Sequence, residues 1–322
     1  MGKAFDVAAL GELLIDFTSC GLSSQGNPLL EANPGGAPCN VLAMLRKLDR
    51  KCVFLGKVGA DSFGDQLEAA IVEAGIDPRG LRRDTEIPTT LAVVHTRHDG
   101  DRSFSFYRKP GADVRLAPEE LDEELIRESR IFHFGSLSLT DEPVRSATKR
   151  ALELARDAGA IVTYDPNLRP PLWPSEALAK EWIEWGLGQC DAVKISDDEV
   201  LFVTGQKDFD VGAAILKERF PNLRLICITA GSGGSYAYYE GRKVWRDSFR
   251  LGGTIETTGA GDTFCACMLD FLLTHGLEGL DEDLLGGMLR FANAAAYLVT
   301  TKKGALRVMP DKAQVEEILA KE

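Results

Sequence analysis

Short apolar runs rich in β-branched residues alternate with helical patterns along this chain, and this alternation constrains the fold more than any other feature. Two of the helical patterns, 144–158 and 64–74, each end just before a glycine, which is a common helix stop. Apolar runs separated by helices are typical of parallel strands that are buried on both faces. The sequence therefore predicts an α/β fold, a three-layer sandwich whose mainly parallel central sheet binds ligands at the carboxyl ends of its strands. The predicted strands are 5–10, 52–58, 131–134, 161–164, 192–195 and 225–229.

Two segments break this rhythm by alternating polar and apolar residues with a period of two. Residues 13–20 form the first segment, and residues 89–107 form the second, which turns back at the hairpin signal 98–101. Because an isolated hairpin is marginally stable, we expect these strands to join a small sheet that stands off the core as a lid or a dimer surface. The alternative is that they are edge strands of the main sheet. We assign residues 1–322 to one α/β domain, with lid segments 11–34 and 86–110.

The charge and the length exclude several classes of partner. The formal net charge is −12 and no basic run is present, which argues against binding to nucleic acid. No apolar stretch approaches the roughly 20 residues of a membrane span, and the first residues lack a signal-peptide core. We therefore expect a cytoplasmic protein without a membrane partner. The 322 residues, 44% of them hydrophobic, suffice for one large domain and a small one.

The cysteines and histidines point away from disulfides and metal centres. Seven cysteines are scattered without a C-x-x-C pair, which disfavours both a disulfide framework and a zinc site. We expect them to be buried apolar residues in a reducing compartment. The four histidines have no ligand spacing with one another or with cysteine, so we expect no histidine metal site.

The segment 256–262, ETTGAGD, carries the strongest chemical signal. It precedes a helical pattern formed by Phe264, Met268, Phe271 and Leu272. Residues 259–261 are therefore expected at a helix N-terminus, where free N–H groups favour anions and glycines let a phosphate approach closely. An acid beside a phosphate repels it, unless the acid accepts a proton from an attacking hydroxyl. We predict that Asp262 is such a base; the alternative is a glycine-rich turn in which Asp262 is an ordinary first-turn acid.

Other polar residues follow predicted strands or begin predicted helices. Residues 33–40 form a second glycine-led helix start with Asn40 in the first turn, and Asp16 lies in the first period-two segment. Both side chains suit the hydroxyls of a polyol. Arg169 follows a buried strand, where its cation could steady a phosphoryl group or an oxyanion. The alternatives are a solvated strand residue for Asp16, a helix cap for Asn40 and a salt bridge for Arg169.

Two further strand ends suit a nucleotide. Residues 194–199 crowd acids at a helix start, which is a weak magnesium signal because the helix dipole alone favours acids there. Residues 229–234 form a glycine-rich turn that suits phosphates. The P-loop motif, a G-x-G-x-x-G after the first strand, the H-R-D loop of protein kinases and the G-x-S-x-G elbow are all absent from the sequence. The predicted phosphate site is thus of another type.

Together these segments resemble the ribokinase-like (PfkB) family of sugar kinases over essentially the whole chain. The matching motifs are Gly35–Gly36 with Asn40, the turn 56–64 (GKVGADSFG) and the signature 258–262 (TGAGD). Within the family, fructokinases are the most similar, and closely similar segments occur in 2-keto-3-deoxygluconate kinases. The segments that favour fructokinases are 165–169 (DPNLR), Leu172–Trp173 and 106–108 (FYR).

The resemblance implies a Rossmann-like fold and ATP-dependent phosphorylation of a sugar hydroxyl, most simply D-fructose to fructose 6-phosphate. The implied catalytic residues are Asp262 as the base, Gly259, Ala260 and Gly261 as the anion hole, and Arg169. The implied sugar ligands are Asp16, Gly35, Gly36, Asn40, Arg108, Arg169 and Asp262, with Phe104 and Phe106 packing over the ring. The implied nucleotide ligands are Lys194, Ser196, Thr229, Gly231, Gly234, Gly261 and Asn293. Glu199 would organise magnesium through water.

Two positions depart from the family pattern. Glu256 stands where relatives commonly carry Asp in a monovalent-cation site, so the resemblance does not decide whether potassium activates this protein. Ser196 stands where many relatives have Asn. The implied cofactors are ATP and Mg²⁺, with K⁺ optional. The implied partners are a small-molecule sugar and ATP, with a possible homodimer through the lid. Two alternatives remain: a 2-keto-3-deoxygluconate kinase, in which Arg108 and Arg169 bind the substrate carboxylate, and a catalytically silent sugar-binding regulator.

Overall fold

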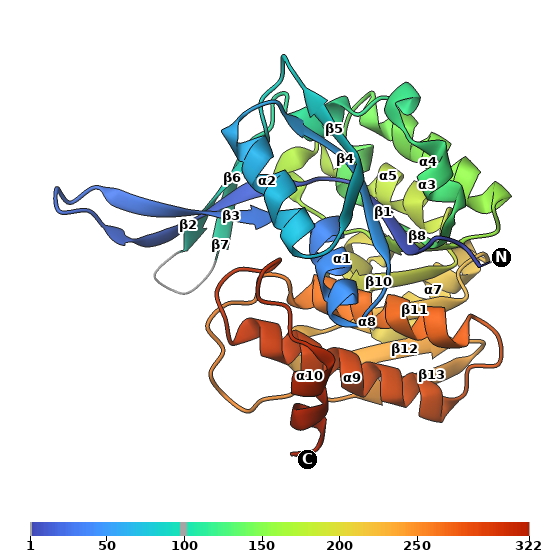
Figure 1. Ribbon diagram of the computed structural model, residues 1–322. Coiled ribbons are helices and arrows are strands. Elements are labelled where there is room, and N and C mark those ends of the chain that lie inside the picture. The colour runs from blue at the N-terminus through green and yellow to red at the C-terminus, as the bar shows by residue number, and fades with distance from the viewer. Residues whose placement is uncertain (1, 97–101, 322) are drawn as a thin grey trace.

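A nine-stranded sheet forms the centre of the molecule, as a computed structural model that describes residues 2–96 and 102–321 shows (Figure 1). Its strands are β1 (Phe5–Leu10), β4 (Cys52–Gly59), β5 (Asp77–Asp84), β8 (Ser129–Gly135), β9 (Ile161–Asp165), β10 (Ala192–Ser196), β11 (Leu225–Thr229), β12 (Ser235–Tyr239) and β13 (Arg242–Arg246). They lie in the order β13-β12-β11-β10-β9-β8-β1-β4-β5. All neighbours from β11 to β5 pair in parallel, whereas β12 and β13 are antiparallel. The predicted parallel sheet is confirmed, including all six predicted strands.

Two hydrophobic cores, one on each face of the sheet, produce the predicted three layers. In β1, Val7 and Ala9 point into one core and Ala8 and Leu10 into the other, because successive side chains of a strand alternate between faces. The first face is covered by α1 (Ala37–Lys47), α2 (Ser62–Glu73), α8 (Ala260–His275), α9 (Glu282–Thr300) and α10 (Lys312–Leu319). The second face is covered by α3 (Glu123–Arg127), α4 (Val144–Asp157), α5 (Glu176–Leu187), α6 (Asp197–Thr204) and α7 (Phe209–Arg219).

The three strands that the sequence did not predict all lie at the ends of the sheet order. β5 mixes Pro78, Gly80 and five charged residues, so it offers no apolar run. Gly80 is required there because a Cβ atom would lie 2.4 Å from the carbonyl oxygen of Phe54. β12 and β13 form an antiparallel hairpin at the opposite edge, where one face of β12 is less buried than the other. Edge strands that are partly solvated do not need the continuous apolar pattern that identified the central strands.

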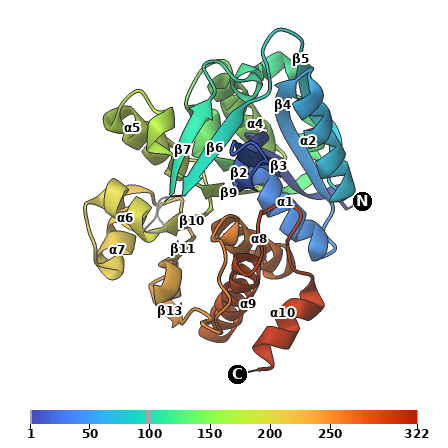
Figure 2. The same cartoon turned by 90° about the vertical axis from the view of Figure 1, so that its left-hand side faces the viewer.

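A second sheet of four strands stands away from the main sheet (Figures 1 and 2). Its order is β3-β2-β6-β7, built from β2 (Leu14–Leu22), β3 (Pro28–Gly35), β6 (Leu91–Thr96) and β7 (Arg102–Tyr107). The period-two segments therefore form a separate sheet, and the alternative of edge strands in the main sheet is wrong. The predicted hairpin signal at 98–101 lies outside the described residues.

The expectation of buried, unpaired cysteines is met with one exception. All seven cysteines are free thiols, and six of them are buried as expected. The exception is Cys20, which is exposed because it lies on the part of β2 that projects beyond the body of the protein. In the described part of the chain, no helix combines the length and the apolar character needed to cross a bilayer.

Candidate active site

Two cavities meet at the N-terminus of α8. One has a volume of about 390 Å³ and lies between this helix, the start of α1 and the small sheet. The other has a volume of about 490 Å³ and lies between α8, α9 and the turn after β11. Thr257 and Gly261 line both cavities. We call the first the polar cavity and the second the apolar cavity, and a group held in one can reach the other across the first turn of α8.

The first turn of α8 has the conformation that the glycine-rich sequence predicts. Gly259 precedes the helix with a φ of 79°, a left-handed conformation that favours glycine. A Cβ atom on Gly259 would also approach the Cβ of Ala305 to 2.9 Å. The N–H of Ala260 donates to the carbonyl oxygen of Thr257 at 3.3 Å. One of the three predicted anion-hole donors is therefore already engaged by the turn itself.

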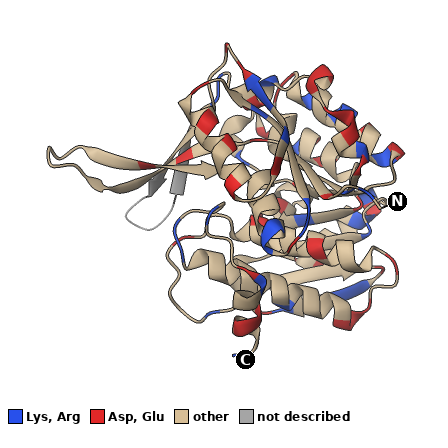
Figure 3. Ribbon diagram, viewed as in Figure 1, with Lys and Arg blue, Asp and Glu red and all other residues tan. Residues whose placement is uncertain are grey.

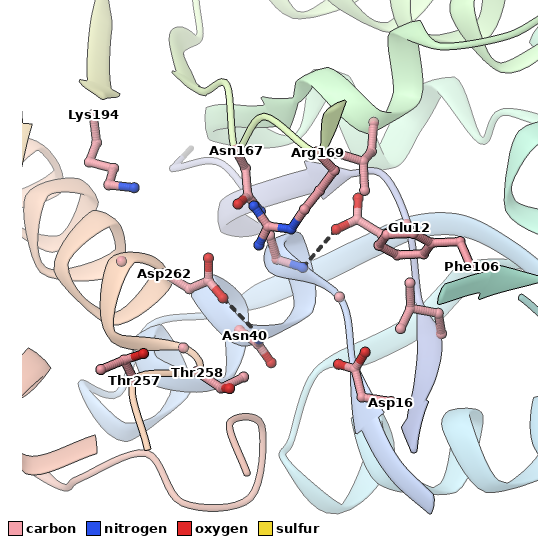
Figure 4. A pocket seen from close by; sticks show the side chains of 16 residues that line it. Glu12, Asp16, Asn40, Phe106, Asn167, Arg169, Lys194, Thr257, Thr258 and Asp262 are labelled. Atoms are coloured by element: carbon pink, nitrogen blue, oxygen red, sulfur yellow. Dashed lines mark hydrogen bonds between the residues drawn. The ribbon is translucent and has the colours of Figure 1, made fainter. Parts of the chain in front are cut away.

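Asp262 faces the polar cavity from the first turn of α8 (Figure 4). Its Oδ2 atom accepts a hydrogen bond of 2.8 Å from Nδ2 of Asn40, which lies in the first turn of α1. Burial raises the pKa of Asp262, and the hydrogen bond from Asn40 and the charges of Lys194 and Arg169 oppose that rise. A carboxylate with a raised pKa is a better proton acceptor than an ordinary aspartate. The arrangement thus places a carboxylate that can accept a proton against the cavity wall.

Glycines at the start of α1 bring the backbone close to two acids of the polar cavity. A Cβ on Gly35 would lie 2.3 Å from Oδ2 of Asp16, and a Cβ on Gly36 would lie 2.4 Å from the carbonyl oxygen of Glu12. Burial raises the pKa of Asp16 to about 7, while the charge of Arg169 lowers it and that of Asp262 raises it. Asp16 and Arg169 both line the polar cavity, together with Gly36, Asn40 and Phe106. The structure therefore brings these predicted sugar ligands together.

A buried ion pair places a positive charge beside the first turn of α8. Nζ of Lys194 lies 3.1 Å from Oδ2 of Asp165, and both side chains are more than nine-tenths buried. Burial alone would lower the pKa of Lys194, but Asp165 and Glu199 raise it above its ordinary value. The ammonium therefore stays charged. A Cβ on Gly261 would lie only 3.0 Å from Nζ of Lys194, so this glycine makes room for the cation.

The predicted nucleotide ligands fall into two groups. Thr229, Gly231, Gly234, Gly261 and Asn293 all line the apolar cavity. Lys194 instead lines the polar cavity. Asn293 also joins α9 to the sheet, because its Nδ2 donates to the carbonyl oxygen of Asp247 at 2.9 Å and its Oδ1 accepts from the hydroxyl of Ser235 at 2.9 Å.

Glu199 and Ser196 form the start of α6 and line neither cavity. The Oε1 of Glu199 accepts from the N–H of Leu168 at 2.7 Å, and its Oε2 accepts from the N–H of Ser196 at 2.9 Å. The two residues form a capping box, in which each side chain accepts from the backbone of the other. Glu256, the candidate for a monovalent-cation site, accepts a hydrogen bond from the hydroxyl of Thr258. Among the described residues, no cluster of three or more His, Cys, Asp or Glu side chains could hold a metal ion by itself.

Arg108, which follows β7, lies away from its predicted place at the sugar. Arg108 does not line the polar cavity: it is buried, with a guanidinium nitrogen 2.7 Å from Oδ2 of Asp113. Its other nitrogens donate to Thr140 Oγ1 and to the carbonyl oxygen of Leu137, both at 2.9 Å. The carboxylate of Asp113 therefore takes the place that a substrate carboxylate would need. Phe106 lines the polar cavity, whereas the side chain of Phe104 lies outside the described part of the structure.

Sequence reasoning missed Glu12, Asp165 and Asn167 as residues of this region. Glu12 and Asn167 line the polar cavity, and Asp165 is the partner of Lys194. Glu12 had a readable signal, since it is an acid two residues after a buried strand, at the edge where ligands collect. Asn167 has a φ of 46°, which is uncommon outside glycine, but the sequence alone does not reveal such a conformation.

An anion-favouring helix start between two cavities, with a carboxylate facing one of them, is the arrangement expected of an enzyme that transfers a phosphoryl group to an alcohol. The comparisons with known proteins name the family: a model of pfkB family carbohydrate kinases matches residues 4–312, and the chain belongs to this family. The chain is 40% identical to a protein called probable fructokinase-4 from Arabidopsis thaliana, over 99% of this chain and 98% of that one.

Solved structures support the same assignment. A fructokinase with bound ATP from Xylella fastidiosa is 30% identical, covers 98% of each chain and gives a TM-score of 0.89. A double-mutant fructokinase from Vibrio cholerae O395, with fructose, ADP and potassium bound, is 26% identical and gives a TM-score of 0.86 over 99% of this chain and 100% of that one. The agreement over the full length extends to the small sheet as well as the main one.

Proposed function

We propose that this protein is an ATP-dependent fructokinase that transfers the γ-phosphoryl group of ATP to the 6-hydroxyl of D-fructose. The observation that carries the proposal is the position of Asp262, which faces the polar cavity from the helix turn whose Gly261 also lines the apolar cavity. A sugar in the first cavity and a nucleotide in the second would meet at this turn. The fructokinase relatives support fructose as the sugar.

In this mechanism the protein supplies positioning and charge rather than covalent chemistry. Asp262 would accept the proton of the attacking hydroxyl, and Asn40 would hold the carboxylate in place. The free N–H groups at the start of α8 and the ammonium of Lys194 would stabilise the negative charge on the transferred group. Asp16 and Arg169, which line the same cavity, would orient the sugar.

The apolar cavity suits the nucleotide because Phe249, Phe264 and Tyr297 line it beside the glycine-rich turn after β11. Magnesium would enter with the triphosphate, which is the usual way for an ion that keeps most of its water ligands. Since both carboxylate oxygens of Glu199 already accept from backbone amides, this residue is suited to contacts through water rather than to direct ligation. Potassium binding near Glu256 stays a prediction from the sequence.

The two alternatives differ from this proposal in substrate and in chemistry. A 2-keto-3-deoxygluconate kinase needs a cation for the substrate carboxylate, but the predicted Arg108 is paired with Asp113 outside the polar cavity. That leaves Arg169, whose charge already acts on Asp16 and Asp262. A silent sugar-binding regulator has no need for a recessed base beside a second, nucleotide-sized cavity. The structure thus offers no observation that favours either alternative.

The small sheet is proposed to act as a lid over the sugar and as a dimer surface. Phe106 of β7 lines the polar cavity, so closure of this sheet would exclude water from the reacting phosphate. The ribbon of β2 and β3 carries only two charged residues, Asp16 and Glu31 (Figure 3). Its Leu22, Leu29 and Leu30 are exposed, and a second copy of the chain would cover them. A cytoplasmic location and the lack of nucleic-acid partners stay predictions from the sequence.

A coupled assay for ADP release across a panel of sugars tests the proposed function. The panel contains D-fructose, D-ribose and 2-keto-3-deoxygluconate at equal concentrations, with and without Mg²⁺ and K⁺. We expect the largest kcat/KM with fructose and no turnover without Mg²⁺. A larger kcat/KM with the keto acid would favour that alternative, and sugar binding without any ADP release would favour the silent regulator.

A further inference from the structure

Helix α1 begins at the polar cavity without a cap from its own sequence. Its N-cap residue is Gly36, which has no side chain, and its second residue is Pro38, which has no N–H group. The cap comes instead from the loop after β1: Oε1 of Glu12 accepts a hydrogen bond of 2.8 Å from the N–H of Ala37 (Figure 4). An acid at this place also complements the positive end of the helix dipole.

The loop after β1 and the start of α1 are packed closely against each other. A Cβ on Gly36 would lie 2.4 Å from the carbonyl oxygen of Glu12, and a Cβ on Gly11 would lie 2.7 Å from Cγ of Pro38. Glu12 itself is only 4% exposed. Its carboxyl group is therefore fixed in place. The first turn of α1 is held by two kinds of contact: the close packing of its backbone against residues 11 and 12, and the hydrogen bond from Ala37 to Glu12.

One turn along α1, Asn40 connects this cap to the base. The N–H of Asn40 donates to the carbonyl oxygen of Gly36 at 3.0 Å, and its Nδ2 donates to Oδ2 of Asp262 at 2.8 Å. We propose that Glu12 is a positioning residue for phosphoryl transfer: by capping α1 it fixes Asn40, and Asn40 fixes the carboxylate of Asp262. The inference rests on the proposed role of Asp262 as the base.

A direct contact between Glu12 and the sugar is the competing explanation, since Glu12 lines the polar cavity. Glutamine separates the two roles. It has the same length and keeps one oxygen that can accept from Ala37, so it preserves the cap. It carries no charge and presents an N–H₂ group instead of the second oxygen, so it changes any contact with the sugar. Burial raises the pKa of Glu12 to about 7, with the charge of Arg108 opposing that rise.

The first experiment measures kcat and KM for fructose in Glu12→Ala and Glu12→Gln. We expect Glu12→Ala to lower kcat about 10- to 100-fold, because small displacements of a reacting group have effects of this size. The KM for fructose should change less than threefold, and Glu12→Gln should restore kcat to within threefold of the wild type. A normal kcat with a raised KM in Glu12→Ala, or a Glu12→Gln variant as slow as Glu12→Ala, would overturn the proposal.

Ala37→Pro provides a second route to the same loss, since it removes the N–H donor and leaves Glu12 intact. Proline is well tolerated at the first position of a helix, so this variant should fold and should show the same decrease in kcat as Glu12→Ala. The matched control is Asp208→Ala, which removes the cap of α7, a helix that contributes no residue to either cavity. It should lower Tm but keep the wild-type kcat. A wild-type kcat in Ala37→Pro would contradict the inference.

A double-mutant cycle tests the route through Asn40. In the Asn40→Ala background, Glu12→Ala should lower kcat less than threefold further, because the connection to Asp262 is already lost. If Glu12→Ala keeps its full effect there, Glu12 does not act through Asn40. Turnover of fructose by the wild type in the same assay reports on the proposed function separately, so failure of one does not conceal failure of the other.

Discussion

Asp262→Asn is the most informative perturbation, because it is expected to lower kcat and, at the same time, to raise the stability of the protein. Asparagine has the shape of aspartate, and its side-chain oxygen can still accept from Nδ2 of Asn40, which is 2.8 Å from Oδ2 in the wild type. The variant then presents an N–H₂ group where the base had presented an acceptor oxygen. The attacking hydroxyl therefore finds no group that takes its proton.

The size of the effect on catalysis follows from the role of a positioned base. General bases contribute about 10²- to 10⁴-fold, which corresponds to about 2.7 to 5.5 kcal/mol of activation free energy. The decrease should fall on kcat, while KM for fructose changes little, because proton transfer belongs to the transition state.

The effect on stability has the opposite sign. Burial raises the pKa of Asp262, so the folded state disfavours its ionised form relative to the unfolded chain. This penalty is present above the folded pKa and disappears below the unfolded pKa. Asparagine carries no such penalty, so Asp262→Asn should raise Tm at pH 8, and the increase should shrink toward pH 4.

The assay combines steady-state kinetics with differential scanning calorimetry at both pH values. The matched control is Asp270→Asn on the same helix, where Asp270 pairs with Arg50 at 2.5 Å outside both cavities. It should keep kcat and should not raise Tm. The reasoning would be refuted by an Asp262→Asn variant that keeps more than a tenth of the wild-type kcat, or by one whose loss of activity comes with a lower Tm at pH 8.

Three further predictions concern the surroundings of Asp262. Gly261→Ala should lower kcat at least about tenfold, because its Cβ would lie 3.0 Å from Nζ of Lys194 and displace that ammonium. The preference of alanine for helices, worth up to about 1 kcal/mol, offsets the cost of this displacement, so the free energy of unfolding should change by less than about 1 kcal/mol. Gly259→Ala, at a φ of 79°, should instead lose about 1 to 2 kcal/mol in urea unfolding, and equal stabilities of the two variants would contradict this account. Arg169→Met removes a charge that lowers the pKa of both Asp16 and Asp262, so the acid limb of the plot of kcat/KM against pH should move to higher pH; an unchanged limb would mean that Arg169 does not act on these acids. Asn293→Ala breaks the link between α9 and the backbone at Asp247, and should raise the KM for ATP while leaving the KM for fructose within twofold, as kinetics at saturating co-substrate would reveal.

The sequence determined the central part of the fold because its signals are local. Runs such as 192–195 and 225–229 are mainly apolar, with Lys194 and Thr229 as the exceptions, which is typical of strands buried on both faces. Glycines follow the helical patterns that they end. The same holds for the first turn of α8, where Gly259 needs a left-handed conformation and Asp262 follows three residues later. The outer strands β5, β12 and β13 escaped prediction because strands at or next to the edge of a sheet are partly solvated and need no continuous apolar pattern.

The positions of individual charges depended on contacts between distant segments. Arg108 follows β7 and looks available in the sequence, but the fold places it against Asp113, Leu137 and Thr140. Lys194 lies next to Asp165 because β9 and β10 are neighbours in the sheet. Glu12 reaches the start of α1 across 25 residues of chain. No periodicity or spacing encodes these pairs, because each depends on which strand ends become neighbours.

By itself, the sequence determined two features: an anion-favouring helix start at residues 259–261 just before Asp262, and a parallel sheet against which that helix packs. Both are readable because backbone conformation and apolar patterns are properties of short segments. Only the tertiary structure decided which side chains surround that acid. Asn40 and Asp262 are 222 residues apart in the chain, and their hydrogen bond exists because α1 and α8 cover the same face of the sheet. Electrostatic effects act through space, so the charge environment of the site emerges only once the helices and strands are packed together.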